Sequence, residues 1–301
     1  MPELELNTSV FTLAELRQAD FTDYDAIYLG DPYCPDYPEN LSLNPGDLEE
    51  AVKLLREQGK TLYLSTYAVP RDADLEQVSR TLELALRLGM EGVEIHNYGV
   101  LNLCRREFPQ LDVHMGCLAN LYTAPGAQVL KNYGVSRVTG NYELSLEELT
   151  ELKTQTGMEF EILLHGKIPL GISEFCLLKE RLPEPKNCLE LCRGSHFLAS
   201  REMSLKSFGR LTLSGKDICM IEHIPQLLAC GFAKFRLETF GEPRDYPGKV
   251  GKIYRLALTE AQKPGYRPQQ YLEELKALSP HGLCNGYYFE VSGQDYIEAG
   301  K

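Results

Sequence analysis

The sequence has no basic run, no apolar run long enough to cross a membrane and no low-complexity tract among its 301 residues. A membrane span needs about 20 consecutive apolar residues, so we expect a soluble, cytoplasmic protein. The formal net charge is -12, which repels phosphate backbones, and nucleic acid is therefore not an expected partner. Because no flexible linker divides the chain, we expect a single domain over residues 1–301.

The motifs of common peptidases are also missing. The chain contains neither a G-x-S-x-G elbow nor an H-E-x-x-H pair, and its six histidines are scattered without the spacing of a zinc triad. Proteolysis needs an activated nucleophile or a metal-bound water. A peptidase is therefore a less favoured alternative, which stays open because triads can assemble from distant residues.

Cysteine, in contrast, is concentrated in one short segment. The stretch HGKIPLGISEFCLLKERLPEPKNCLELC places Cys176, Cys188 and Cys192 within 17 residues, and Cys188 and Cys192 would point the same way on one helical turn. Three convergent thiols favour a metal or iron–sulfur site. A fourth ligand must come from elsewhere, and Cys34 is the first candidate.

Other interpretations of these cysteines remain open. An isolated buried cysteine often behaves as a small apolar residue, and zinc also accepts four thiolates, although its ligands usually come in two close pairs. Disulfides are disfavoured because the count of nine is odd and no secretory leader precedes the first expected strand. Spacing alone does not separate zinc from an iron–sulfur cluster.

Short apolar runs alternate with segments of helical periodicity along the chain. We expect strands at Glu3–Leu6, Ala26–Leu29, Thr61–Ser65, Gly92–Ile95, Asp112–Met115, Ser136–Val138, Phe160–Leu164 and Lys234–Leu237. Eight such units predict a TIM-type (β/α)8 barrel, with an open doubly wound sheet as the alternative. Residues 166–222 form a cysteine-rich insertion between the last two strands, and Ser214-Gly215 in it predicts a hairpin turn.

Active sites of such barrels lie where the strands end. That rim would collect Ser65, Thr66, His96, Asn97, Asn120, Tyr122, His165, Arg236 and Glu238. Of these, we take Asn120, His165, Arg236 and Glu238 as candidate catalytic residues, because a guanidinium can hold a carboxylate and an imidazole can move protons near neutral pH. A salt bridge or rim hydrogen bond is the structural alternative for each.

Several motifs together resemble the collagenase-like peptidase family of unclassified mechanism. They are YLG after the second strand, ELSLEEL at 143–149, HG before a G-x-S-x-x-C segment, and SGKDIC at 214–219. The resemblance covers nearly the whole chain. PLGISEFC at 169–176 and CNGYY at 284–288 are most similar to the UbiU/UbiV branch, UbiV type.

The resemblance implies a 4Fe-4S cluster on Cys34, Cys176, Cys188 and Cys192. It also implies a subunit of an oxygen-independent hydroxylase that joins a UbiU-like second family member as a heterodimer. Its expected substrate is a small aromatic ring in ubiquinone biosynthesis. An RNA-modifying hydroxylase and a noncatalytic cluster-bearing scaffold are the alternatives. Cys219 departs from the UbiV pattern and is a fifth thiol, a substitute ligand or an inert strand residue.

Overall fold

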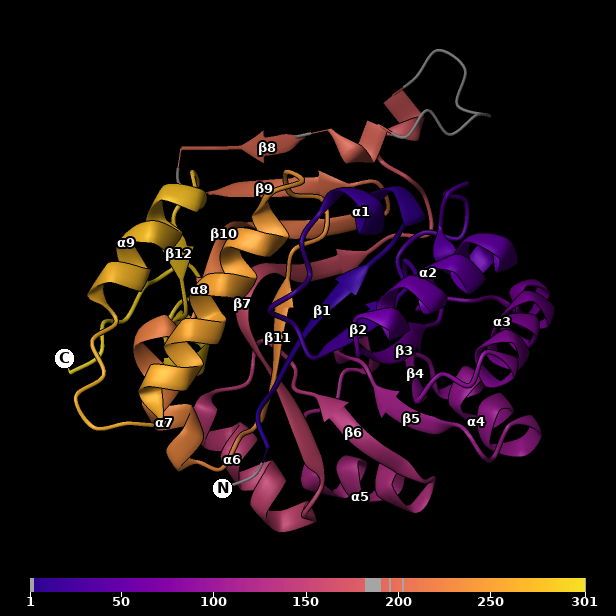
Figure 1. Ribbon diagram of the computed structural model, residues 1–301, viewed down its shortest axis with the longest axis horizontal. Coiled ribbons are helices and arrows are strands. Elements are labelled where there is room, and N and C mark those ends of the chain that lie inside the picture. The colour runs from indigo at the N-terminus through magenta and orange to yellow at the C-terminus, as the bar shows by residue number, and fades with distance from the viewer. Residues whose placement is uncertain (1–2, 182–190, 195, 202, 301) are drawn as a thin grey trace.

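A closed barrel of eight parallel strands forms the centre of the computed structural model, which describes residues 3–181, 191–194, 196–201 and 203–300 (Figure 1). The strands follow the order β1-β2-β3-β4-β5-β6-β7-β11, and β11 pairs with both β7 and β1. Their bounds are Glu5–Val10 (β1), Ala26–Leu29 (β2), Thr61–Ser65 (β3), Gly92–Ile95 (β4), Asp112–Met115 (β5), Val135–Thr139 (β6), Glu159–Ile172 (β7) and Lys234–Glu238 (β11). The TIM-type barrel is thus confirmed, and closure through β11 excludes the open sheet.

Helices connect the strands and pack around the outside of the barrel (Figure 1). They are α1 Leu13–Gln18, α2 Pro45–Glu57, α3 Leu75–Arg87, α4 Tyr98–Glu107, α5 Ala124–Asn132, α6 Leu146–Thr156, α7 Ile224–Ala229, α8 Tyr246–Ala261 and α9 Gln269–Leu278. Residues Thr12 and Ser145 cap α1 and α6 with their side chains, as their spacing to Glu15 and Glu148 predicts. None of the described helices combines the length and apolar character needed to cross a bilayer.

Side chains alternate between the barrel interior and the helical layer along each strand. Strand β4 is an example: Val93 and Ile95 lie in the main apolar core with the surrounding helices, whereas Glu94 between them pairs with Arg236 of β11. The outward face is therefore apolar and the inward face is polar and charged. The interiors of such barrels are commonly filled by layers of branched aliphatic side chains, whereas this interior is filled by polar and charged ones.

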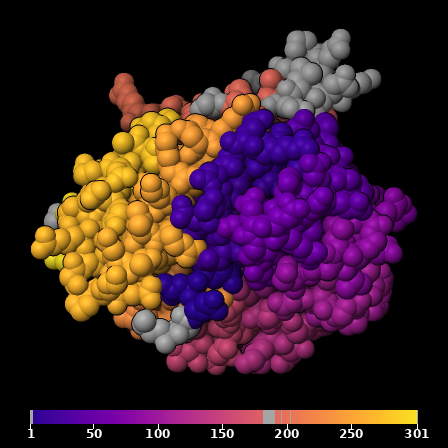
Figure 2. Space-filling view, viewed as in Figure 1, coloured from indigo at the N-terminus to yellow at the C-terminus, as the bar shows by residue number. Residues whose placement is uncertain are grey.

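Strand β7 is 14 residues long and continues beyond the barrel. Its far half pairs antiparallel with β10 (Leu211–Cys219), which pairs with β9 (Ser204–Phe208), and β9 pairs with β8 (Phe197–Ala199). The short strand β12 (Leu283–Cys284) joins β10 in parallel. In Figure 2 this extension lies along the upper edge of the molecule, beside the N-terminal elements.

The expected hairpin at Ser214-Gly215 is wrong, because β10 runs straight through both residues. The turn lies instead at Gly209-Arg210, between β9 and β10. A Cβ atom on Gly215 would come within 2.0 Å of the Ser204 hydroxyl oxygen, so this glycine permits close contact with the neighbouring chain. The register between β10 and β7 also shifts on either side of Leu213, which is the signature of a bulge rather than a turn.

Candidate functional site

Two of the predicted cluster cysteines meet at the β9–β10 turn. The position of a Cβ atom on Gly209 would lie 3.7 Å from the Cys176 sulfur and 3.9 Å from the Cys192 sulfur. The two sulfurs therefore lie within the sum of those distances of each other. Gly209 has a φ of +68°, which favours glycine. The backbone N–H of Lys179 lies 3.4 Å from the Cys176 sulfur and donates to it.

Cys34 lies close to this turn, although it comes from the opposite end of the chain. Arg210, the residue after Gly209, pairs with Asp36 at 2.7 Å and lowers the pKa of the Cys34 thiol. Burial and the charge of Asp31 outweigh the effect of Arg210, and they raise the pKa of the Cys34 thiol to about 12. A thiol of this kind becomes a thiolate when a bound cation supplies the compensating positive charge.

The loop that carries Cys34 is held by its own side chains. The Asp31 carboxylate accepts a hydrogen bond from the Tyr33 backbone N–H at 2.8 Å, and Asn40 accepts one from the Asp31 N–H at 2.9 Å. The Asn40 amide in turn donates to the Cys34 carbonyl at 3.2 Å. The loop conformation that presents Cys34 is therefore fixed by three residues within ten positions of one another.

These cysteines suit the donor set of an iron–sulfur cluster, since thiolates are its usual protein ligands. Cys188, the remaining predicted ligand, lies outside the described residues. Within those residues, no three His, Cys, Asp or Glu side chains stand close enough to hold a metal ion as they are placed. Of the predicted site, the described residues therefore show Cys176 and Cys192 together, beside the loop that carries Cys34.

A cluster of aromatic and aliphatic side chains lies between these cysteines and the barrel. Its buried members are Phe11, Tyr33, Phe208, Leu211, Leu213 and Phe240, and Cys192 packs against it. Phe11 and Phe240 stack at 4.9 Å between ring centroids, and Tyr33 lies 5.4 Å from Phe240. Because Phe11, Tyr33 and Phe240 follow the ends of β1, β2 and β11, this aromatic roof covers the mouth of the barrel.

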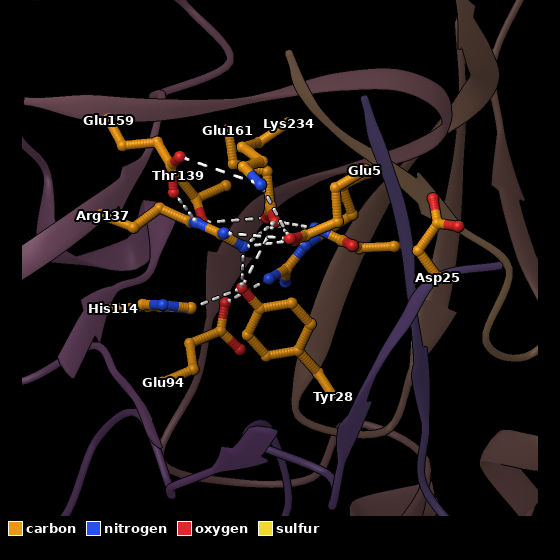
Figure 3. A network of polar contacts seen from close by, with 12 residues as sticks. Glu5, Asp25, Tyr28, Glu94, His114, Arg137, Thr139, Glu159, Glu161 and Lys234 are labelled. Carbon is orange, nitrogen blue, oxygen red and sulfur yellow. Dashed lines mark hydrogen bonds and ion pairs between the residues drawn. The ribbon is translucent and has the colours of Figure 1, made fainter. Parts of the chain in front are cut away.

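Below the roof, Arg236 lies at the centre of a buried ion network. Its Nε is 2.6 Å from Glu161 and its Nη2 is 2.8 Å from Glu94, and its guanidinium lies 4.0 Å from the centroid of the Tyr28 ring. Figure 3 shows the network continuing through Tyr28 toward Arg137. Arg236 was predicted to hold a carboxylate. In the structure its guanidinium pairs with the carboxylates of Glu94 and Glu161 in the same chain.

Glu94 and Glu238, two glutamates beside Arg236 at the upper end of the network, differ in pKa. Burial alone would raise the pKa of Glu94, but Arg236 and His96 hold it below its ordinary value. Burial raises the pKa of Glu238 to about 7, against the attraction of Arg236 at 3.5 Å and with the repulsion of Glu94 and Glu161. Glu238 therefore exchanges a proton near neutral pH while Glu94 stays ionised. Such a pair of unlike carboxyls is typical of sites that move protons.

The structure brings Arg236 and Glu238 together but places the other two predicted catalytic residues elsewhere. His165 packs against α8, where its Nε2 lies 2.8 Å from the Tyr246 hydroxyl, and burial lowers its pKa to about 4. Asn120 is exposed and ends a short turn in the left-handed conformation, with φ at +54°. An asparagine tolerates this conformation better than most residues. Their catalytic roles stay predictions.

Residues that the sequence did not mark as catalytic complete the upper end of the interior. Glu94 lies on the inward face of β4 and His96 follows directly after the strand, with the His96 Nε2 3.5 Å from a Glu94 oxygen. Tyr142, after β6, faces the Cys117 thiol, and burial raises the pKa of that thiol to about 12. Polar residues at alternate positions in otherwise apolar strands were the available signal for Glu94.

Cys219 lies away from the roof. It is fully buried in β10, and the Tyr254 hydroxyl donates to its sulfur at 3.7 Å. Burial raises the pKa of its thiol to about 11. These contacts are those of an inert strand residue, the third of the roles considered for it.

A TIM-type barrel that carries a cysteine-bearing strand extension at its mouth defines the class of protein. The family model described as Peptidase family U32 matches residues 12–298. The chain therefore belongs to the U32 family, which is the collagenase-like family indicated by its motifs.

Curated relatives carry several different names. The chain is 23% identical to tRNA hydroxylation protein P of Escherichia coli (strain K12), with 97% of this chain and 76% of the relative covered. It is 27% identical to an uncharacterized protease of Methanocaldococcus jannaschii, with 96% and 74% covered. It is 22% identical to a 23S rRNA 5-hydroxycytidine synthase of Escherichia coli (strain K12), with 85% and 39% covered.

Solved structures resemble this chain in fold. 3-Hexulose-6-phosphate synthase superposes with a TM-score of 0.50 at 13% identity, over 85% of this chain and 100% of that chain. At this identity the match supports the fold and carries no information about the reaction.

Proposed function

We propose that this chain is the iron–sulfur subunit of an oxygen-independent hydroxylase that acts on an aromatic ring. Membership of the U32 family supports a hydroxylase, because its relatives include proteins named for tRNA hydroxylation and for 5-hydroxycytidine synthesis. The observation that carries the proposal is the convergence of Cys176 and Cys192 on Gly209, beside the loop that presents Cys34.

In this proposal Cys34, Cys176, Cys188 and Cys192 hold a 4Fe-4S cluster above the barrel mouth. The cluster would supply electron transfer, and an organic hydroxyl donor would supply the oxygen atom, because the reaction does not use dioxygen. The chain itself contributes an N–H donor from Lys179 to one sulfur and the Arg210 guanidinium close to another. The aromatic roof excludes water from the end of the barrel interior that lies nearest the cluster. Beneath this roof, Glu238 holds or releases a proton.

For the substrate, we propose a small aromatic ring of ubiquinone biosynthesis, hydroxylated together with a UbiU-like second family member in the cytoplasm. The net charge of -12 and the buried acidic groups of the barrel favour an uncharged ring over a polyanion. The names of the relatives favour the second candidate, a base within an RNA. Both candidates share the chemistry of hydroxylating an uncharged planar ring.

The cluster can be tested by anaerobic purification followed by iron, sulfide and zinc analysis and visible absorption. Substitution of Cys34, Cys176, Cys188 or Cys192 by Ala should abolish the iron and the colour. Cys219→Ala and Cys104→Ala are matched controls, because both thiols are buried and lie outside the proposed ligand set. Zinc bound to the protein without iron or sulfide would refute the proposal. Visible colour that survives each of the four substitutions would refute it as well.

The substrate can be tested by deleting the gene and measuring two products. Loss of anaerobically made ubiquinone with intact RNA hydroxylation would support the small-ring substrate. Loss of a hydroxylated pyrimidine in tRNA or rRNA would support the RNA base instead. Co-purification with a second U32 chain, followed by assays of each chain alone, would determine whether this subunit holds the reacting ring.

A further inference from the structure

The upper end of the barrel interior holds several buried polar atoms whose hydrogen bonds are long or missing within the described residues. They are both carboxylate oxygens of Glu238, both ring nitrogens of His96 and the hydroxyl of Tyr142. The side chains of Glu238 and His96 are each only 2% exposed, and Tyr142 is 4% exposed. The contacts that these groups do make are long or weak, since Glu238 Oε1 lies 3.5 Å from Arg236, His96 Nε2 lies 3.5 Å from Glu94, and Tyr142 faces the Cys117 thiol. Buried polar atoms are almost always paired, so the second oxygen of Glu238 and the Nδ1 atom of His96, which lack a hydrogen bond in the described residues, call for an explanation.

The three side chains share one location although they come from different strands. Burial raises the pKa of Tyr142, and the neighbouring Cys117 thiol and Glu238 raise it further. His96 lies across Gly116, the residue before Cys117, so that a Cβ there would be only 2.1 to 2.8 Å from the imidazole ring. The carboxyl ends of β4, β5, β6 and β11 thus direct these groups toward the axis of the barrel, which is where a ligand binds in this fold.

The aromatic roof closes the same place from above. Tyr33 belongs to the roof, and burial raises its pKa. Glu238, Cys117 and Glu94 raise this pKa further, so the roof and the polar groups are neighbours. Phe11 and Phe240 present stacked rings from the ends of β1 and β11. A ligand here would meet flat apolar surfaces on one side and hydrogen-bonding groups on the other.

Charge narrows the class of ligand further. The carboxyl groups of Glu94, Glu161 and Glu238 surround the guanidinium of Arg236, and the only other cation that pairs with them among the described arginines and lysines is Arg137, 3.7 Å from Glu161. A phosphate or carboxylate brought into this space would be repelled by at least one ionised glutamate. An uncharged ring with a donor on its edge would instead offer a hydrogen to Glu238 and accept one from Tyr142.

We propose that Glu238, His96 and Tyr142, under the roof formed by Phe11, Tyr33 and Phe240, bind the polar edge of an uncharged planar ring. A phenol and a pyrimidine base share this chemistry. The inference rests on the proposed function for the idea that a ring is the substrate, and it adds where the ring binds and which side chains recognise it. Because the site is buried, the roof must move for a ring to enter.

The site can be tested by titrating the full-length, anaerobically purified chain with p-cresol, 1-methyluracil and toluene, followed by ligand-observed NMR. We expect saturable binding of at least one polar ring and none of toluene, which lacks a polar edge. Tyr142→Phe should weaken binding about tenfold because it removes one hydrogen bond to the ligand, and Glu238→Gln should weaken it because a neutral amide oxygen replaces a charged acceptor. Binding of p-cresol alone would indicate a small aromatic substrate, and binding of 1-methyluracil alone a nucleobase.

Tyr288→Phe is the matched control. Tyr288 is also buried, but its hydroxyl donates to the Leu163 carbonyl at 2.9 Å and it lies outside the proposed site. This variant should bind the ring as the wild type does. Equal binding by all variants, or no saturable binding of either polar ring to folded protein, would overturn the inference.

The same assay separates this inference from the proposed cluster. A Cys34→Ala chain that has lost its iron but still binds the ring would support the ring site independently of the cluster. A chain with full iron content that binds neither ring would retain the proposed cluster and lose the ring site.

Discussion

Arg236 of β11 and Glu161 of β7 form an ion pair of 2.6 Å inside the barrel, and their side chains are 4% and 0% exposed. Glu94 completes the pair from the other side at 2.8 Å. A buried charge of this kind stabilises the fold only while its partners are present. The network therefore joins three strands that are far apart in sequence, β4, β7 and β11.

Arg236→Met should destabilise the protein strongly, because it leaves the buried carboxylate of Glu94 without an arginine and that of Glu161 with only Arg137, at 3.7 Å. The expected loss is about 3–5 kcal/mol in the free energy of unfolding, measured by urea denaturation. Lys249→Met is the control, since it breaks an exposed pair with Asp245 one helical turn away and should leave the urea midpoint near that of the wild type. A midpoint for Arg236→Met equal to that of the control would contradict the role given to the network.

Glu238 should make stability depend on pH in a particular direction. Its folded-state pKa is raised from 4.5 to about 7 by burial and by Glu94 and Glu161, against Arg236. A raised pKa contributes stability that is fully present below about pH 4.5 and is lost as pH rises through 7. The groups that face Glu238 include Tyr33, Tyr142 and Cys117 from the neighbouring strand ends.

Glu238→Gln removes this titration, so the difference between wild type and variant isolates it from the other carboxyls. Relative to the variant, the wild type should lose up to about 3 kcal/mol between pH 4.5 and 8, seen in urea unfolding at a series of pH values. A difference that stays constant over that range would show that Glu238 titrates normally.

Much of the fold could be predicted because local patterns determine it. The eight barrel strands follow from apolar runs, and the caps of α1 and α6 follow from Ser or Thr with Glu three residues on. The grouping of Cys176 with Cys192 follows from their closeness in sequence, and both thiols lie against Gly209 in the β9–β10 turn.

The interior of the barrel could not be predicted in the same way. Whether Arg236 meets Glu94, Glu161 or a ligand depends on which strands close the barrel and in what register, and no spacing in the sequence records this. The hairpin failed for a related reason. Ser214-Gly215 has the composition of a turn, but the close approach of Ser204 is a tertiary contact that decides its conformation.

Gly209→Ala should reduce iron binding more than it reduces stability. Its φ of +68° is unfavourable for alanine, at a cost of about 1–2 kcal/mol, and the added methyl would lie against both thiols, 3.7 Å from the Cys176 sulfur and 3.9 Å from the Cys192 sulfur. Iron per chain after anaerobic purification should fall severalfold while thermal unfolding stays cooperative.

Gly265→Ala carries the same backbone cost without the thiols. Its φ is +85° and no atom lies within 4 Å of the new methyl. It should lower the melting temperature by a similar amount and keep its iron. If both variants keep their iron equally, Gly209 does not position the two cysteines for a cluster.

Gly116→Ala should disturb the upper interior through His96 alone. The backbone at Gly116 is ordinary, with φ at −75°, but the new methyl would lie 2.1 to 2.8 Å from three atoms of the His96 ring. Since the ring is buried and must move, we expect a loss of about 1–3 kcal/mol in stability together with a large shift of the His96 ring signals in the NMR spectrum.

Gly46→Ala is the matched control for this substitution. Gly46 lies in α2 with no atom within 4 Å of an added methyl, so alanine there should be neutral or should stabilise the helix by up to about 1 kcal/mol. Binding of the polar ring should be lost in Gly116→Ala and kept in Gly46→Ala. A Gly116→Ala chain with unchanged stability and unchanged ring binding would mean that His96 is not held against Gly116, and the proposed ring site would lose one of its three recognising side chains.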